Sequence, residues 1–372
     1  MSGSGEQLPV INALHRPFGL FEWGKPNTKL LLIGEAPGED EERYGRPFVG
    51  ASGQLLNILL EQSGFTRADF NITNVFTERP PGNDFKTNWT TTKTELKKSG
   101  HSMAARLPPI NKRYLLPELE HHVVRLHEEI DALKPEFILL LGATALWAVT
   151  GEGRIGQNRG TILNLPKGRV GLATFHPAMV LRQWDQRPLV WADLSKAAKY
   201  LAGTLPKPLE RLFYIDPTFE EIEHVYRVFA ANPHWTIGVD IETDPRIGQI
   251  TTISFCTPRF GICIPFYNRN TLPALCNFWH TAAEEAKAWR WVMAFGALPN
   301  PKVGQNFLYD HQYLLEDLDI RIRNLSDDTS ILQHSLQPEL PKALGTLASL
   351  YLNEPSWKFM RESSKDDNKA DE

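Results

Sequence analysis

The chain has 372 residues, a hydrophobic content of 42% and a formal net charge of −4. This length fits two domains, and no run of about 18 or more apolar residues is present that would cross a membrane. The three cysteines, Cys256, Cys263 and Cys276, form no CxxC pair, which argues against a zinc site or a disulfide framework and favours a reducing cytoplasm.

Apolar strands and amphipathic helices alternate through the first half of the chain. Buried strands are predicted from the apolar runs at residues 30–34, 70–75, 137–142 and 169–174. Helices are predicted at residues 51–63, 116–133, from 144 onward and at 189–202. This alternation predicts an α/β fold, a three-layer α/β/α sandwich around a parallel sheet, with its active site at the carboxyl ends of the strands.

A glycine-rich segment follows the first predicted strand. It reads Gly34-Glu35-Ala36-Pro37-Gly38 and continues at residue 45 with Gly-Arg-Pro-Phe-Val-Gly. Glycines let the backbone approach a ligand closely, and Glu35 can orient or deprotonate a water there. Phe48 is placed to stack on a planar ring. Such a loop could equally bind a nucleotide phosphate, but the dinucleotide and P-loop glycine patterns are both absent.

Two polar residues stand at the ends of later strands. The amide of Asn74 can donate to one base atom and accept from another, the pattern that separates uracil from cytosine; an Asx turn is the structural alternative. His176 lies in Phe-His-Pro-Ala and can donate to a base oxygen as negative charge develops on it. A lone histidine is also compatible with a purely structural role.

These motifs, in this order, resemble the family 4 uracil-DNA glycosylases over roughly residues 28–200. The resemblance implies that Glu35 positions a water and His176 stabilises the leaving uracil. It assigns binding of the base to Gly34, Ala36, Phe48 and Asn74. It also implies that the loop Met179-Val180-Leu181-Arg182 wedges into the duplex where the base has left.

Two features bear on that resemblance. The family holds an iron–sulfur cluster on four cysteines, but this chain has none before Cys256, so we expect no cluster and no cofactor in the glycosylase domain. A basic insertion at 86–113 is either a solvated loop or a contact to the DNA backbone. The DNA-binding candidates are Arg79, Lys93, Lys97, Lys98, Met179, Leu181 and Arg182.

The pattern changes after a predicted linker at residues 203–212. Strands are predicted at residues 235–241, 250–256, 261–266 and 302–305, and helices near 281–295, 307–317 and 326–336. Asp240 and Glu242 share one face of the first of these strands, a geometry suited to a divalent metal, and Asp310 follows.

This half resembles the proofreading 3′–5′ exonuclease domain of family A DNA polymerases, which has an RNase H-like fold. The resemblance implies a Mg²⁺ or Mn²⁺ site on Asp240, Glu242 and Asp310. The family's fourth carboxylate lies in a Tyr-x-x-x-Asp segment, which the charged tail 361–372 lacks. We therefore expect an incomplete exonuclease domain and a disordered tail.

The predicted domains are an N-terminal extension at 1–27, a glycosylase-like domain at 28–202 and an exonuclease-like domain at 213–360. Their order resembles the front of a phage DNA polymerase. We expect the chain to excise uracil from single- or double-stranded DNA, coupled to a replication and proofreading exonuclease module. The alternative is a non-catalytic module that binds DNA or uracil. The expected partners are DNA, a DNA polymerase domain and other replication proteins, with no membrane, in the cytoplasm of a bacterial host.

Overall fold

A computed structural model of the protein describes residues 20–100, 107–110, 112–207, 209–244, 248–268 and 276–352. The chain divides into two compact units, and residues from Ala348 onward belong with the first unit rather than with the second, Lys207–Leu347. Residues 348–352 were predicted to lie in the second domain, at residues 213–360. Most of the predicted extension 1–27 and the whole tail 361–372 lie outside the described residues. Within the described ranges, no helix has the length and apolar character needed to cross a membrane.

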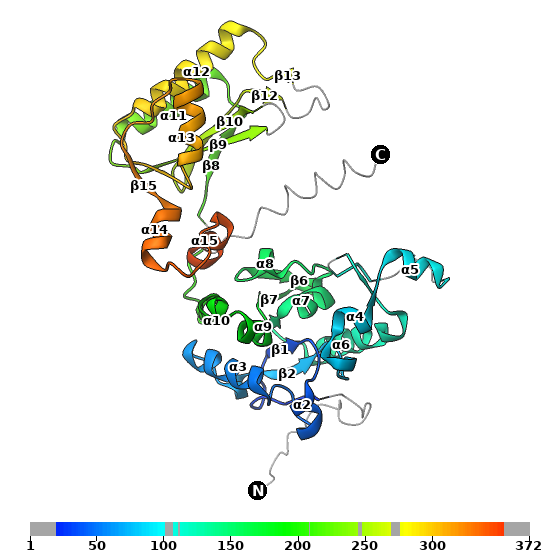
Figure 1. The fold of residues 1–372 in the computed structure, drawn as a ribbon. Coiled ribbons are helices and arrows are strands. Elements are labelled where there is room, and N and C mark those ends of the chain that lie inside the picture. Colours follow the sequence, from blue (N-terminus) through cyan, green and yellow to red (C-terminus); the bar gives the residue numbers. More distant parts are fainter. Residues whose placement is uncertain are drawn as a thin grey trace. The chain divides into compact units, whose positions relative to one another are not determined.

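The first unit is built on a five-stranded sheet with the order β2-β1-β5-β7-β6 (Figure 1). The strands are β1 (Leu30–Gly34), β2 (Asn71–Asn74), β5 (Phe137–Leu141), β6 (Ile162–Leu165) and β7 (Arg169–Thr174). Four of them run parallel, as predicted, while β6 pairs antiparallel with β7 at one edge. The sequence did not indicate β6.

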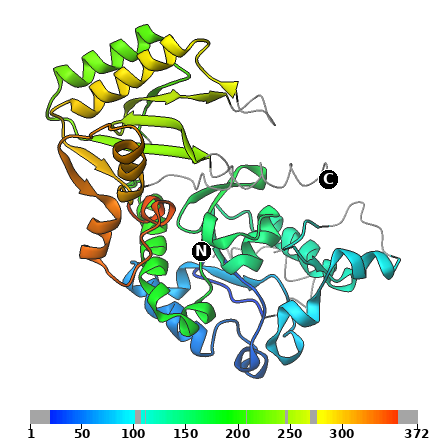
Figure 2. The ribbon, with the colours of Figure 1, turned by 45° about the horizontal axis from the view of Figure 1, so that its top comes forward.

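Helices cover both faces of this sheet and make the predicted three layers (Figure 2). The helices are α2 (Glu39–Tyr44), α3 (Ala51–Gln62), α6 (Glu120–Leu133), α7 (Gly142–Thr150), α8 (Ile155–Asn158), α9 (Pro177–Arg182) and α10 (Arg187–Leu201). Successive strand residues point to opposite faces. Accordingly, Leu31 and Ile33 pack in the core under α6 and α7, whereas Leu32 packs in the core under α3 and α10.

The basic insertion carries short elements of its own. They are α4 (Phe85–Trp89), β3 (Thr90–Thr91), α5 (Lys93–Lys98) and β4 (Tyr114–Leu115), and β3 pairs with β4. Trp89 and Leu96 are buried, which anchors these elements to the unit. A capping box formed by Thr92 and Glu95 starts α5.

The second unit has a mixed six-stranded sheet with the order β15-β14-β9-β10-β11-β8. The strands are β8 (Leu212–Ile215), β9 (Ile237–Asp244), β10 (Gln249–Cys256), β11 (Phe260–Pro265), β14 (Lys302–Gly304) and β15 (Leu325–Asp328), with a separate pair, β12 (Tyr267–Asn268) and β13 (Cys276–Asn277). An antiparallel meander, β9-β10-β11, continues into β14 and β15, which run parallel to β9. This order is the predicted RNase H-like α/β arrangement.

The helices of the second unit depart from the prediction in several places. They are α11 (Phe219–Ala231), α12 (Ala282–Ala297), α13 (Leu308–Gln312), α14 (Thr329–Leu336) and α15 (Leu344–Tyr351), the last of which ends in the first unit. The helix expected at 307–317 continues beyond α13 as a π-helical turn. Residues 326–328 are strand rather than helix, because Asp328 caps α14 through the Ser330 amide. The elements β8, α11 and α15 were not predicted, and β8 begins inside the expected linker.

Candidate active site

The carboxyl ends of β1, β2 and β7 bring together Gly34, Asn74 and the turn that carries His176. The side chains of Asn74 and Phe48 lie very close to the Cα atom of Gly34. A Cβ atom at this position would lie 2.3 Å from Asn74 Oδ1 and 2.5 Å from Phe48 Cζ. Because real Cβ contacts are never this short, only glycine fits at this position. The side chains of Asn74 and Phe48 therefore both lie against the backbone of Gly34.

Asn74 is 5% exposed, and its Oδ1 atom has no hydrogen-bond partner among the described residues. A buried carbonyl oxygen without a donor costs about 1–3 kcal/mol. The Asx turn considered as an alternative would have occupied this oxygen. Its position beside Phe48 instead suits a planar ligand that carries an N–H group.

Phe48 is held in an unusual backbone conformation, with a φ of 50°. Its buried ring lies against the ring of His176, with centroids 5.7 Å apart and planes tilted by 31°. Arg67 stabilises the loop by donating to the carbonyl oxygens of Phe48 (3.0 Å) and Pro47 (2.5 Å). An ion pair with Glu22, at 2.7 Å, orients Arg67 in turn.

Glu41 ties the two glycine-rich segments together. Its buried carboxylate accepts from the amides of Gly38 (3.0 Å) on one side and of Val49 (2.8 Å) and Gly50 (2.9 Å) on the other. Amide donors of this kind suit a charged carboxylate. Neither Glu41 nor Arg67 was predicted from the sequence, because their partners are backbone atoms of other segments.

Glu35 lies directly after β1 and accepts a hydrogen bond from Thr144 Oγ1 of α7 at 2.5 Å. Burial raises the pKa of Glu35, while the hydrogen bond from Thr144 and the positive charge of Arg182 act in the opposite direction. A buried carboxylate with one orienting donor has a second oxygen for a water. Thr144 was also missed, although it stands in the predicted helix that follows the third strand.

His176 caps α9, and its Nδ1 atom accepts from the Ala178 amide at 3.2 Å. This bond assigns the ring proton to Nε2, which therefore acts as a donor. Burial, and to a lesser extent the positive charge of Arg182, lower the pKa of His176 to about 4 against the opposing effect of Glu41. His176 is thus neutral near pH 7 and offers a single N–H group.

Arg125, on α6, stabilises the carboxyl end of β2. Its guanidinium donates to the carbonyl oxygens of Asn74 (2.7 Å) and Val75 (2.9 Å), and it forms an ion pair with Glu129. Burial raises the pKa of Glu129, and the nearby Arg125 and Thr73 lower it. The i,i+4 spacing of Arg125 and Glu129 on a predicted helix was the signal that could have marked this pair.

The candidate DNA-binding residues lie at three places in the first unit. Leu181 and Arg182 are exposed on α9, a short helix rather than the expected loop, because Pro177 and the His176 cap start a helical turn there. The positive charge of Arg182 acts on both Glu35 and His176. Met179 is half-buried on the same helix.

The other candidates are Arg79, in the segment between β2 and α4, and three lysines on α5 of the basic insertion. Arg79 forms an exposed ion pair with Glu39 at 3.3 Å, which contributes little to stability. Lys93, Lys97 and Lys98 are exposed on α5. Ala36 is half-buried beside the core under α6 and α7.

In the second unit, Asp240 and Glu242 share one face of β9, and the buried Val239 and Ile241 share the other. Asp310 on α13 is buried and accepts from the Ile241 amide at 2.8 Å. Burial, helped by the negative charge of Asp240, raises the pKa of Asp310 to about 6, although the Ile241 hydrogen bond acts in the opposite direction. The described residues contain no group of three or more His, Cys, Asp or Glu side chains placed to hold a metal ion. The shared metal site therefore stays a prediction.

Comparisons with known proteins agree with this division of the chain. A family model described as the uracil DNA glycosylase superfamily matches residues 21–198. A type-4 uracil-DNA glycosylase of Thermotoga maritima is 35% identical over 182 residues, which are 48% of this chain and 80% of that protein. A DNA polymerase of Bacillus phage SP01 is 22% identical over 236 residues, which are 61% of this chain and 22% of the polymerase.

Among solved structures, the catalytic core of RRP6 from Trypanosoma brucei matches 40% of this chain. The match covers 38% of that structure's chain, with a TM-score of 0.28 and 20% sequence identity. The RNase H-like fold of the second unit is assigned from its strand order, β15-β14-β9-β10-β11-β8.

Proposed function

The chain belongs to the uracil-DNA glycosylase superfamily, and from this premise we propose that its first unit hydrolyses the N-glycosidic bond between uracil and deoxyribose in DNA. The observation that carries the proposal is the buried Asn74 Oδ1, which has no donor among the described residues and lies beside Phe48 and Gly34. Uracil offers N3–H to this oxygen and O4 to the amide nitrogen, whereas cytosine presents an acceptor and a donor in reversed positions.

The proposed reaction uses three side chains. The flipped uracil stacks on Phe48, and the Glu35 carboxylate orients a water toward C1′ and takes its proton as the C1′–O bond forms. The C1′–N1 bond breaks, and its electron pair leaves with uracil as an anion. His176 donates a hydrogen bond from its single N–H group, Nε2–H, to uracil O2 as this charge develops.

This chemistry uses protein side chains and water and requires no metal or cluster. The iron–sulfur cluster of related enzymes has no cysteine ligands before Cys256 in this chain. We therefore propose that the loops around the base depend on Glu41 and Arg67, whose backbone contacts hold the Phe48 loop.

Asn74→Ala tests the assignment of the base-binding residue. It should lower the rate of uracil release by about tenfold or more, because a bidentate base contact contributes about 1–3 kcal/mol. Asn164→Ala, at an exposed position on the edge strand β6 of the same sheet, is the matched control and should keep the wild-type rate. Equal rates in both variants would remove Asn74 from the site. Binding of uracil DNA without release, in the wild type, would support the non-catalytic alternative.

For the second unit we propose a metal-dependent contact with DNA through Asp240, Glu242 and Asp310. Carboxylate oxygens are the ligands that Mg²⁺ and Mn²⁺ prefer. The charge coupling between Asp240 and Asp310 supports their proximity. One oxygen of the Asp310 carboxylate also accepts from the Ile241 amide. We also propose a DNA polymerase domain as a partner of this chain.

A further inference from the structure

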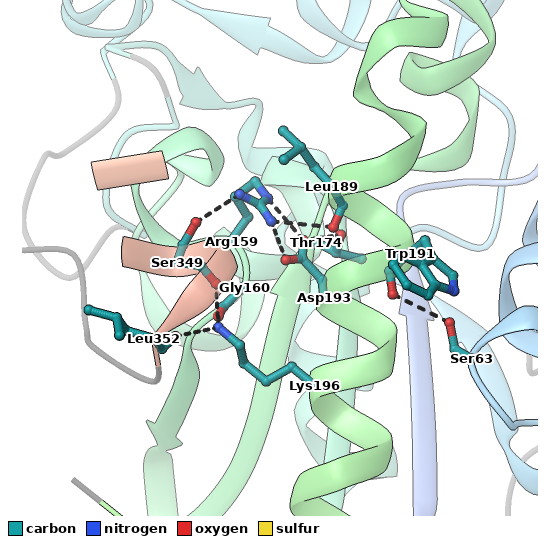
Figure 3. A network of polar contacts seen from close by, with 10 residues as sticks. All are labelled: Ser63, Arg159, Gly160, Thr174, Leu189, Trp191, Asp193, Lys196, Ser349 and Leu352. Carbon is teal, nitrogen blue, oxygen red and sulfur yellow. Dashed lines mark hydrogen bonds and ion pairs between the residues drawn. The ribbon is translucent and has the colours of Figure 1, made fainter. Parts of the chain in front are cut away.

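Residues 348–352 follow the second unit along the chain and join a buried polar cluster of the first unit (Figure 3). The charged members of the cluster are Arg159, Asp193 and Lys196, which are 3%, 1% and 7% exposed. The drawn cluster thus holds two cations and one carboxylate. Buried charges are tolerated only where hydrogen-bond partners compensate them, so the remaining acceptors matter.

The end of α15 supplies those acceptors. Lys196 Nζ donates to the carbonyl oxygens of Ser349 and Leu352, the latter at 2.8 Å, and to that of Gly160 at 2.7 Å. The last carbonyls of a helix have no partner within the helix and carry the negative end of its dipole. They therefore suit a buried ammonium group. Arg159 adds a bond from Nη1 to Ser349 Oγ at 2.9 Å.

The same cluster supports the turn that carries His176. Asp193 accepts from Arg159 Nε at 2.9 Å and from Thr174 Oγ1 at 2.6 Å. Thr174 ends β7, two residues before His176. The guanidinium of Arg159 also lies over the ring of Phe175, 5.7 Å from its centroid. Both residues that lead into His176 are thus held by Asp193 and Arg159.

We propose that the docked segment 348–352 is a positioning element for His176, so that sequence beyond the second unit completes the uracil site. The inference rests on the proposed glycosylase function. Without the segment, Arg159 loses its bond to Ser349 Oγ, and Lys196 keeps only the Gly160 carbonyl oxygen of its three acceptors. Each buried donor N–H that loses its acceptor costs about 1–3 kcal/mol. Among the described residues, the Arg159 side chain then keeps hydrogen bonds only to Asp193 and Leu189, so the positions of Asp193 and Phe175, and through them the turn at Thr174, are less well fixed.

Ala348→Glu in the full chain tests this inference, because Ala348 is 5% exposed and a carboxylate there cannot be accommodated while the segment is docked. Tyr351→Glu, at a position 57% exposed on the same helix, is the matched control. Docking is read from amide hydrogen exchange across residues 344–352. The state of His176 is read from its imidazole ¹⁵N signals, and uracil release from the single-turnover rate.

In the wild type and in Tyr351→Glu we expect slow exchange and a neutral His176 with its proton on Nε2. In Ala348→Glu we expect fast exchange, altered His176 signals and a rate about tenfold lower at unchanged DNA affinity, since small displacements of catalytic groups cost this much. If Ala348→Glu fails to fold, Ser349→Ala should lower the rate by about threefold, the cost of one hydrogen bond, with recovery in Ser349→Thr.

Fast exchange of residues 348–352 in the wild type would overturn the docking. Unchanged His176 signals in an undocked variant would overturn the positioning role. A wild-type chain that releases no uracil would contradict the proposed function instead. The exchange and His176 signals of that chain would still decide the inference.

Discussion

Replacing Thr144 with valine should move the acid limb of uracil release to higher pH. Thr144 is 2% exposed and donates to Glu35 Oε2, and valine keeps its shape while removing the hydroxyl. Burial already raises the pKa of Glu35, and the Thr144 hydrogen bond is the largest influence that lowers it. Without the hydrogen bond, the pKa of Glu35 must rise further.

The size of this shift follows from the strength of the hydrogen bond. A hydrogen bond to a charged group contributes about 1.5–3 kcal/mol, and one pKa unit corresponds to about 1.4 kcal/mol. The acid limb should therefore move upward by about one to two units. The sign is fixed because only ionised Glu35 can take a proton from water, and a higher pKa extends its protonated form to higher pH. His176 titrates near pH 4, so its own protonation should appear below this limb.

Single-turnover rates of uracil release from pH 4 to pH 8, a range of about four units, would measure the limb. Thr144→Ser keeps the hydroxyl and is the matched control, so its limb should stay near that of the wild type. An unmoved limb in Thr144→Val would refute the proton-accepting role of Glu35. An equal shift in Thr144→Ser would show that packing of the threonine methyl, and not the hydrogen bond, sets the pKa.

Three further outcomes are expected. His176→Ala should lower the uracil release rate by ~10²–10³-fold, and a wild-type rate would exclude the histidine from the reaction. The salt dependence of DNA affinity should weaken, by about 0.9 in slope for each phosphate that is no longer neutralised, when the three exposed lysines of α5 are changed together to alanine; an unchanged slope would mean that the helix is only solvated. The purified protein should contain no iron, since the first unit lacks cysteine; stoichiometric iron with visible absorbance would contradict this.

The parallel core of the first unit was predictable because its strands are continuous apolar runs. The apolar runs at residues 30–34 and 137–142 favour buried strands, and the structure has β1 and β5 there, with Gly142 already the first residue of α7. The motif residues follow at the carboxyl ends of the strands, where parallel sheets bind ligands. The edge strand β6 was not predictable in this way. Its side chains are partly exposed, so its apolar pattern is weak, and its pairing with β7 is fixed by tertiary contacts.

The site residues that belong to the sequence motifs were predictable. Glu35, Asn74 and His176 each follow a recognisable strand, and the structure brings their segments together. Thr144, Glu41 and the Arg159 cluster were not predicted, because their partners are distant in sequence and several are backbone atoms that no side-chain pattern reveals. The return of residues 348–352 to the first unit is the extreme case, since Lys196 and Leu352 are 156 positions apart.

Uracil release by the wild-type chain in the presence of a chelator is the most direct test of the central claim. A labelled oligonucleotide with one uracil is incubated with the full-length chain in EDTA, and free base is separated by chromatography, beside matched strands that carry cytosine or thymine. We expect free uracil and an intact strand with one abasic site, because the proposed reaction uses only Glu35, His176 and water. Absence of free uracil, or release that requires added metal, would contradict the account.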